Sequence, residues 1–212
     1  MKIEGKIISF LGDSITQGVG VSCEENRYPD RIGKKHGAKK INNYGIGGTR
    51  FAEQMKKEQP IDFQDFSFRS KELDKESDII VVFGGTNDFG HGDAPIGTFE
   101  DRTPETFYGA CHTIMQNLIN EYPTAQKVIC TPLHRAIEDE PCSRGIVLRD
   151  FVNIIKEVAE YYALPVCDLW SASGIQPRVE VIKEMYCPDG LHPNDAGQEL
   201  LAERIANFIL AL

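Results

Sequence analysis

The sequence predicts an α/β fold in which a parallel β-sheet is covered by helices on both faces. Short apolar runs alternate along the chain with longer segments of helical periodicity, the pattern of strands joined by crossover helices. Residues 79–83 are apolar throughout, as expected of a central strand that is buried on both sides. No repeat, low-complexity stretch or Gly/Ser/Pro-rich linker interrupts the 212 residues, so we expect a single domain over residues 1–212.

Each predicted strand is a short apolar or β-branched run, and each predicted helix has apolar residues spaced by three and four. The predicted strands are residues 6–11, 40–44, 78–83, 127–131 and 165–168. The predicted helices are residues 28–36, 50–58, 105–122, 144–162 and 193–211. Proline residues at the start of the last helix (Pro193) and just before residue 105 (Pro104) support those two starting points.

Two segments do not follow the alternation of strands and helices. Residues 59–75 are mixed in composition, and we expect an irregular excursion that packs Phe63, Phe66 and Phe68 onto the body of the domain. Residues 89–104 are rich in Gly, Pro and Asp, and we expect them to form a loop at the rim of an active site.

Composition narrows the classes of partner and location. The net charge of −9 argues against nucleic acid and against an anionic membrane, because both reward a basic surface. Residues 1–6 carry charges where a signal peptide needs an apolar core, and no apolar run is long enough to span a bilayer. We therefore expect a cytoplasmic protein, and nothing in the sequence indicates a homo-oligomer.

The cysteine pattern suggests neither a metal site nor a redox motif. None of the 6 cysteines belongs to a C-x-x-C pair. Cys130 and Cys167 lie in apolar strand-like runs and are expected to be buried thiols. In a reducing compartment we expect all of the cysteines to be free, and we expect no metal or other cofactor.

Polar groups follow the first three predicted strands, where a parallel sheet gathers its ligands. The groups are Gly12-Asp13-Ser14, Asn42-Asn43-Tyr44-Gly45-Ile46-Gly47-Gly48-Thr49 and Gly84-Gly85-Thr86-Asn87-Asp88. A fourth polar group, residues 187–194, precedes the last helix. If the strands are parallel, the first three groups share one edge of the sheet, so we expect these residues to lie close together.

These groups contain what acyl transfer from an ester requires: a hydroxyl, a base, a group that orients the base, and donors for the oxyanion. Ser14 supplies the hydroxyl. His192 is the candidate base, because an imidazole titrates near neutral pH, and Asp189 can fix its tautomer. The expected oxyanion donors are the amides of Ser14 and Gly45 and the side-chain amide of Asn87.

On these motifs the chain resembles the SGNH hydrolases, the GDSL-type esterase and lipase family. The matching blocks are Gly12-Asp13-Ser14-Ile15-Thr16, Asn43-Tyr44-Gly45-Ile46-Gly47-Gly48, Gly84-Gly85-Thr86-Asn87-Asp88 and Asp189-Gly190-Leu191-His192-Pro193. They come in the family's order and extend over nearly the whole chain, and Ile15 replaces the usual Leu. The resemblance implies a flavodoxin-like three-layer α/β/α sandwich with a five-stranded parallel sheet, and metal-independent hydrolysis of acyl esters.

Each block alone also fits a structural role. A Gly-Asp-Ser sequence can be a turn, Asn87-Asp88 an Asx-turn, and Asp189 a loop cap. Two other functional classes stay open: a non-catalytic binder of a glycan or small ligand, and a metal-dependent phosphoesterase. The phosphoesterase is disfavoured because no Asp-x-His or paired-acid cluster follows the strands.

For the substrate, the sequence favours a small ester with a short acyl group, such as acetyl on a carbohydrate. The loops at the sheet edge are short and polar, and no apolar insertion could form a lipase lid. A lysophospholipase or thioesterase-type acylhydrolase is the alternative within the family. Asp13, His134 and Arg135 are candidate substrate-binding residues, and His91 lies in the expected rim loop without an assigned role.

Overall fold

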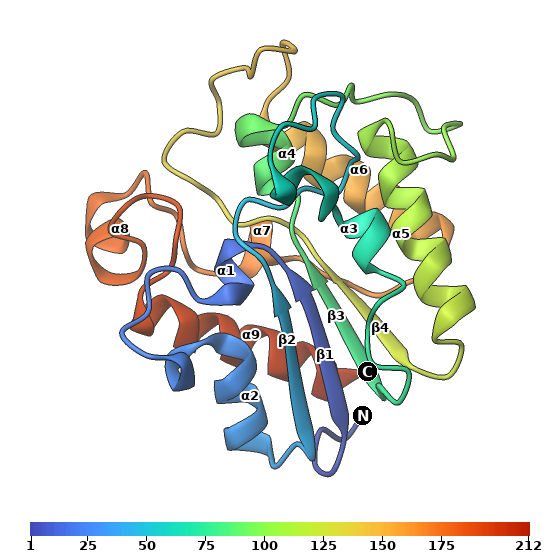
Figure 1. Cartoon of the computed structure of the whole chain (residues 1–212). Coiled ribbons are helices and arrows are strands. Elements are labelled where there is room, and N and C mark those ends of the chain that lie inside the picture. The colour runs from blue at the N-terminus through green and yellow to red at the C-terminus, as the bar shows by residue number, and fades with distance from the viewer.

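A five-stranded parallel sheet with strand order β2-β1-β3-β4-β5 organises the computed structural model, which describes residues 1–212 (Figure 1). The strands are β1 (Ile7–Gly12), β2 (Lys40–Gly45), β3 (Ile79–Phe83), β4 (Gln126–Cys130) and β5 (Val166–Cys167). All neighbouring strands pair in parallel. The predicted fold class is confirmed, and each strand lies within one residue of its predicted bounds.

Four longer helices cover the two faces of the sheet: α2 (Tyr28–His36), α5 (Phe107–Glu121), α6 (Leu148–Tyr161) and α9 (Asp195–Ala211). Helices α2 and α9 pack together on one face, and α5 and α6 lie on the other (Figure 1). The shorter helices are α1 (Ser14–Gln17), α3 (Phe66–Arg69), α4 (Thr86–His91), α7 (Leu169–Ala172) and α8 (Glu180–Tyr186). Short 3₁₀ turns occur at Glu24–Asn26 and Pro60–Phe63.

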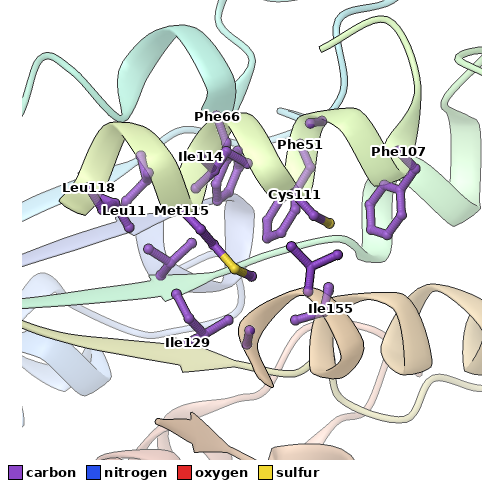
Figure 2. Packing of buried hydrophobic residues seen from close by; sticks show 14 of the residues in the cluster. Leu11, Phe51, Phe66, Phe107, Cys111, Ile114, Met115, Leu118, Ile129 and Ile155 are labelled. Carbon is purple, nitrogen blue, oxygen red and sulfur yellow. The ribbon is translucent and has the colours of Figure 1, made fainter. Parts of the chain in front are cut away.

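The hydrophobic core consists of two clusters, one on each face of the sheet, and successive side chains of β3 point alternately into one and the other. Ile80 and Val82 contribute to the cluster under α5 and α6, whereas Ile79 and Val81 contribute to the cluster under α2 and α9. Figure 2 shows the first cluster, in which side chains of α5 such as Met115 gather over the sheet. A strand covered on both faces must be apolar at every position, which explains the uninterrupted run at residues 79–83.

Helices α5 and α9 begin within two residues of their predicted starts, where local signals mark the ends, whereas α6 begins four residues after its predicted start. Thr106 caps α5 by accepting a hydrogen bond from the Gly109 amide at 3.1 Å. Asn194 caps α9 in the same way, accepting from the Gly197 amide at 3.0 Å. Helix α2 ends at Gly37, whose φ of 68° is the left-handed conformation that glycine adopts without strain.

The helix predicted at residues 50–58 is wrong, because two carboxylates from later in the chain capture amides that a helix would use. Asp88 accepts hydrogen bonds from the Phe51 and Ala52 amides at 2.9 and 3.0 Å. Asp93 accepts hydrogen bonds from the amides of Met55 and Lys56. An amide bonded to a side chain cannot also bond the carbonyl four residues earlier, so this segment folds as an extended loop.

The segment 59–75 is irregular as predicted, but only one of its three phenylalanines packs inward. Phe66 is fully buried in the first core cluster. Phe63 and Phe68 are each 54% exposed, so the expectation that all three pack onto the domain is wrong. The predicted rim loop at 89–104 is also shorter than expected, because its first residues complete α4.

The strand order reverses direction between β1 and β3, because β2 lies on one side of β1 and β3 on the other. Such a switch point opens a crevice at the carboxyl ends of the strands. The residues that follow β1, β2 and β3 all reach this edge.

Cys130 and Cys167 are buried, and all six cysteines are unpaired. None of the helices has the length and apolar character needed to cross a membrane.

Candidate active site

Ser14 is the first residue of α1, a single helical turn that begins directly after β1. Asp13 caps this turn by accepting a hydrogen bond from the Ile15 amide at 3.0 Å. Thr16 packs against Gly12 so closely that a Cβ at position 12 would meet its Oγ1 at 1.9 Å. This tight strand-to-helix turn leaves the Ser14 side chain at the surface end of the sheet, where 8% of the residue is exposed.

His192 lies opposite Ser14, with its Nε2 at 3.0 Å from the Ser14 hydroxyl oxygen. Its other ring nitrogen, Nδ1, lies 2.7 Å from Asp189 Oδ2. The carboxylate accepts a hydrogen bond from Nδ1–H, so in the neutral ring the lone pair of Nε2 faces the hydroxyl of Ser14. Three side chains from the first and last parts of the chain therefore form one continuous hydrogen-bonded row.

The loop before α9 holds Asp189 in place through the backbone. Asp189 Oδ1 accepts hydrogen bonds from the Leu191 amide at 2.8 Å and the His192 amide at 2.7 Å. The turn is closed by Gly190, whose φ of 78° is left-handed. Partial burial opposes ionisation, but the hydrogen bonds from the two amides and the His192 ring outweigh it and lower the pKa of Asp189. The carboxylate is thus charged and fixed toward His192.

Gly45, the expected oxyanion donor, does not offer a free amide. Its N–H donates to Asn43 Oδ1 at 2.8 Å. A Cβ on Gly45 would lie 2.2 Å from the Gln17 nitrogen, so this glycine permits the close packing of β2 against α1. The prediction that the Gly45 amide is available to the oxyanion is therefore wrong.

Two other backbone amides near Ser14 have no hydrogen-bond partner in the protein. One is the amide of Ser14 itself, in the first turn of α1, where helix amides lack an internal acceptor. The other is the amide of Gly48, which follows Gly47 in the loop after β2. This loop passes directly beside the nucleophile candidate, since a Cβ on Gly47 would lie 3.6 Å from Ser14 Cβ. The Gly47 amide itself donates to Gln17 Oε1 at 2.7 Å.

The two last residues of the polar group after β3 differ in their surroundings: Asn87 keeps a free N–H, whereas Asp88 lies in the interior. Asn87 is 5% exposed and donates from Nδ2 to the Thr49 carbonyl at 3.0 Å, which leaves its second N–H without a partner. Asp88 faces the interior, where it holds the Phe51 and Ala52 amides. Burial raises the pKa of Asp88 to about 7 despite these hydrogen bonds. Asp88 is thus a structural residue.

Asp13 is wrongly predicted as a substrate-binding residue. It is 1% exposed, and its carboxyl group is occupied by the cap of α1. Burial raises the pKa of Asp13 to about 6, against the opposing hydrogen bond from the Ile15 amide. A carboxyl group enclosed in this way cannot contact a substrate.

His134 and Arg135 lie in the loop after β4, at the same edge of the sheet. The His134 ring packs against Trp170 with 3.8 Å between the ring centroids, and its Nδ1 lies 2.9 Å from Glu138 Oε1, which indicates a packing role. Arg135 donates to the Thr86 carbonyl at 3.2 Å. The next amide, that of Ala136, donates to the Gly190 carbonyl at 2.8 Å. Arg135 therefore lies between the Asn87 and Asp189 groups.

Two residues to which the sequence assigned no role organise the site. Arg69 of α3 donates to the Tyr44 and Gly12 carbonyls and so ties the ends of β2 and β1 together. Burial lowers the pKa of Arg69 to about 10. His91 contacts Asn87, from which it is separated by four residues in α4. That helical spacing is the one signal that could have identified His91, whereas no local pattern points to Arg69.

Comparison with known proteins agrees with this arrangement. The family model described as the GDSL-like Lipase/Acylhydrolase family matches residues 10–200. One crystal structure is 31% identical in sequence and superimposes with a TM-score of 0.90, over 100% of this chain and 99% of the other. A protein from Lactobacillus plantarum is 26% identical with a TM-score of 0.86, over 99% and 98% of the two chains.

More distant structures share the fold. An acetyl xylan esterase is 21% identical with a TM-score of 0.66, over 95% of this chain and 98% of that one. A member of the lipolytic G-D-S-L family from Veillonella parvula is 17% identical with the same TM-score, over 97% and 99%. A comparison with curated proteins finds no match.

Proposed function

Since the chain belongs to the GDSL-like lipase/acylhydrolase family and is thus a carboxylic ester hydrolase, we propose that Ser14, His192 and Asp189 form its catalytic triad. The observation that carries this proposal is the row of contacts from Ser14 Oγ to His192 Nε2 and from His192 Nδ1 to Asp189. The first distance, 3.0 Å, lies within the range for a nucleophile and its base.

In the proposed reaction, the Ser14 hydroxyl attacks the carbonyl carbon of the ester and transfers its proton to His192 Nε2. Asp189 stabilises the imidazolium that forms. The tetrahedral intermediate then expels the alcohol, which takes the proton from His192, and leaves an acyl group on Ser14. A water molecule, deprotonated by His192, attacks this acyl-enzyme and releases the carboxylic acid. The proton returned by His192 restores the Ser14 hydroxyl.

For the oxyanion hole we propose the amides of Ser14 and Gly48 and the free N–H of Asn87. Gly48 replaces Gly45 in this role, because the Gly45 amide is bonded to Asn43 whereas the Gly48 amide has no partner. Donors that are already oriented stabilise the charge that develops on the carbonyl oxygen without reorganisation during the reaction.

We propose a small ester with a short acyl group and a polar alcohol, such as an acetylated carbohydrate. A cavity of about 370 Å³ beside α4 supports the polar alcohol, because it is lined only by polar and charged residues. These residues are Arg50, Gln54, Lys56, Glu58, Gln59, Asp62, His91 and Asp93. The acetyl xylan esterase among the structural neighbours makes an acetylated xylan a suitable first natural substrate to test.

One observation favours the alternative of a longer acyl chain. Helix α8 leads directly into the loop that carries Asp189 and His192, and it exposes apolar side chains. Val181 and Met185 are 57% and 50% exposed. An apolar surface beside the loop would suit the acyl chain of a lysophospholipid or thioester.

Rates on p-nitrophenyl esters of increasing acyl length separate the two substrate classes. We expect kcat/KM to be highest for acetate and to fall beyond butyrate, because the cavity beside α4 is lined by polar and charged residues and offers a long chain no apolar burial. Steady-state hydrolysis of acetate, butyrate and octanoate esters measures this. A Met185→Ser variant is the matched control for the α8 surface. A kcat/KM that rises beyond butyrate, and falls again in Met185→Ser, would replace the short-acyl proposal with the alternative.

A contact between Arg135 and the substrate is also part of the proposal. Its guanidinium lies between the groups of Asn87 and Asp189, and no carboxylate lies within ion-pair distance of it. A cation without an ion-pair partner at this edge could bind a polar or anionic part of the alcohol.

A further inference from the structure

Asn87 is held by a histidine of its own helix. His91 and Asn87 are four residues apart in α4 and therefore lie on the same face, one turn from each other. His91 Nε2 lies 3.2 Å from Asn87 Oδ1. On the other side of the ring, Nδ1 lies 3.1 Å from a terminal nitrogen of Arg50.

The contact with Arg50 determines which ring nitrogen carries the proton. A guanidinium group can only donate hydrogen bonds, so Nδ1 of His91 must accept. The proton of the neutral ring is then on Nε2, which donates to Asn87 Oδ1. Partial desolvation and the guanidinium groups of Arg50 and Arg135 lower the pKa of His91, which is consistent with a neutral ring.

Arg50 is itself held in place by an ion pair, so it stays positioned to donate to His91, which in turn donates to Asn87. Its second terminal nitrogen forms an ion pair with Asp62. The other oxygen of Asp62 accepts from the amides of Glu58 and Gln59, at 3.0 and 2.8 Å. Because Arg50 is only 8% exposed, its guanidinium has little freedom to leave His91.

This arrangement specifies the orientation of the Asn87 amide. With Oδ1 facing a donor and Nδ2 facing the Thr49 carbonyl, both neighbours are satisfied. Rotating the amide by half a turn would set N–H against N–H at His91 and oxygen against oxygen at Thr49. It would also replace the unpartnered N–H, the proposed oxyanion donor, with a carbonyl oxygen.

We propose that His91 is a positioning residue that acts through Asn87: it holds the amide so that the free N–H points at the oxyanion. This inference rests on the proposed function of Asn87. His91 also lines the cavity proposed for the polar alcohol, so the inference is tested on p-nitrophenyl acetate, which has no carbohydrate to place there. With this ester, the effect of His91 should appear in the transition state rather than in substrate binding.

Kinetics on p-nitrophenyl acetate test the inference with two substitutions at position 91. His91→Leu keeps the bulk of the ring and removes the donor, and we expect kcat to fall about tenfold with KM changed less than about twofold. His91→Gln places an amide N–H near the position of Nε2, and we expect it to recover most of kcat. His36→Leu, a histidine in α2 without a side-chain hydrogen bond, is the matched control and should keep full activity.

A double-mutant cycle with Asn87→Ala shows whether His91 acts through Asn87. The single Asn87→Ala variant should lose about 100- to 1,000-fold in kcat. Adding His91→Leu to it should cost less than about twofold more, because the group that His91 positions is already absent.

Three results would overturn the inference. One is full kcat in His91→Leu. Another is a tenfold loss that persists in the Asn87→Ala background, which would indicate an independent structural effect. The third is a loss that His91→Gln does not recover. If Asn87→Ala itself retained full kcat, the proposed oxyanion hole would fail together with the inference. A normal defect in Asn87→Ala combined with full activity in His91→Leu would refute the inference alone.

Discussion

Replacing Ser14 with alanine is expected to reduce kcat on p-nitrophenyl acetate by about 10,000- to 1,000,000-fold. In the proposed triad only Ser14 forms the acyl-enzyme, because His192 and Asp189 act on the proton of its hydroxyl. Loss of the nucleophile in a serine hydrolase removes the chemical step and leaves only the weak rate enhancement of the oxyanion hole and substrate binding. Stopped and continuous assays of p-nitrophenol release measure the loss.

The substitution itself should not disturb the fold. The only hydrogen bond of Ser14 Oγ is with His192, and alanine is a good helix former in the first turn of α1. The melting temperature and circular dichroism spectrum should therefore match those of the unmodified protein. Ser143→Ala, which alters an exposed serine far along the chain, is the matched control and should keep full activity. A Ser14→Ala variant with more than about a tenth of the original kcat would refute the role of Ser14.

The Asp189→Asn substitution is expected to reduce kcat by about 1,000- to 10,000-fold. The backbone determines how the new amide must lie. The Leu191 and His192 amides require an oxygen at the position of Oδ1, so the NH₂ group of asparagine must face His192 Nδ1. Nδ1 then has to accept a hydrogen bond from this NH₂ group, so the neutral ring carries its proton on Nε2. A protonated Nε2 cannot act as a base for the Ser14 hydroxyl.

Asp195→Asn is the matched control for this substitution. Asp195 is also an acid in the final part of the chain, at the start of α9, but its carboxylate bonds only to the exposed Ser22. We expect its kcat to remain within about twofold of the original value. Should Asp189→Asn retain a kcat within about tenfold of the original, Asp189 would not be the group that selects the tautomer of His192.

The sheet was predictable because its signals are local. Each strand is a short apolar run, and the all-apolar run at residues 79–83 needs two covering layers wherever it lies. The periodicities of α5, α6 and α9 are equally visible in short windows of sequence. The helix predicted at residues 50–58 fails for the opposite reason. Its amides are bonded by the carboxylates of Asp88 and Asp93, which lie 37 and 38 residues later in the sequence than the amides of Phe51 and Met55.

The candidate site divides in the same way. Ser14, Asn87, Asp189 and His192 follow strands or precede a helix, and a parallel sheet brings such positions to one edge, so their convergence could be predicted. The choice of Gly45 could not, because it depends on a contact of its amide with Asn43. Asp13 resembles a reactive carboxylate in sequence, but its burial becomes apparent only when α1 and the sheet are in place.

Covalent labelling with a fluorophosphonate, followed by peptide mass spectrometry, tests the central claim most directly. An activated serine displaces fluoride and forms a phosphonate ester on its Oγ, whereas a protein that only binds a glycan or small ligand need not contain such a serine. We predict a single adduct on Ser14, formed in step with the loss of esterase activity, and no adduct in the Ser14→Ala variant. Loss of activity without an adduct on Ser14 would contradict the account.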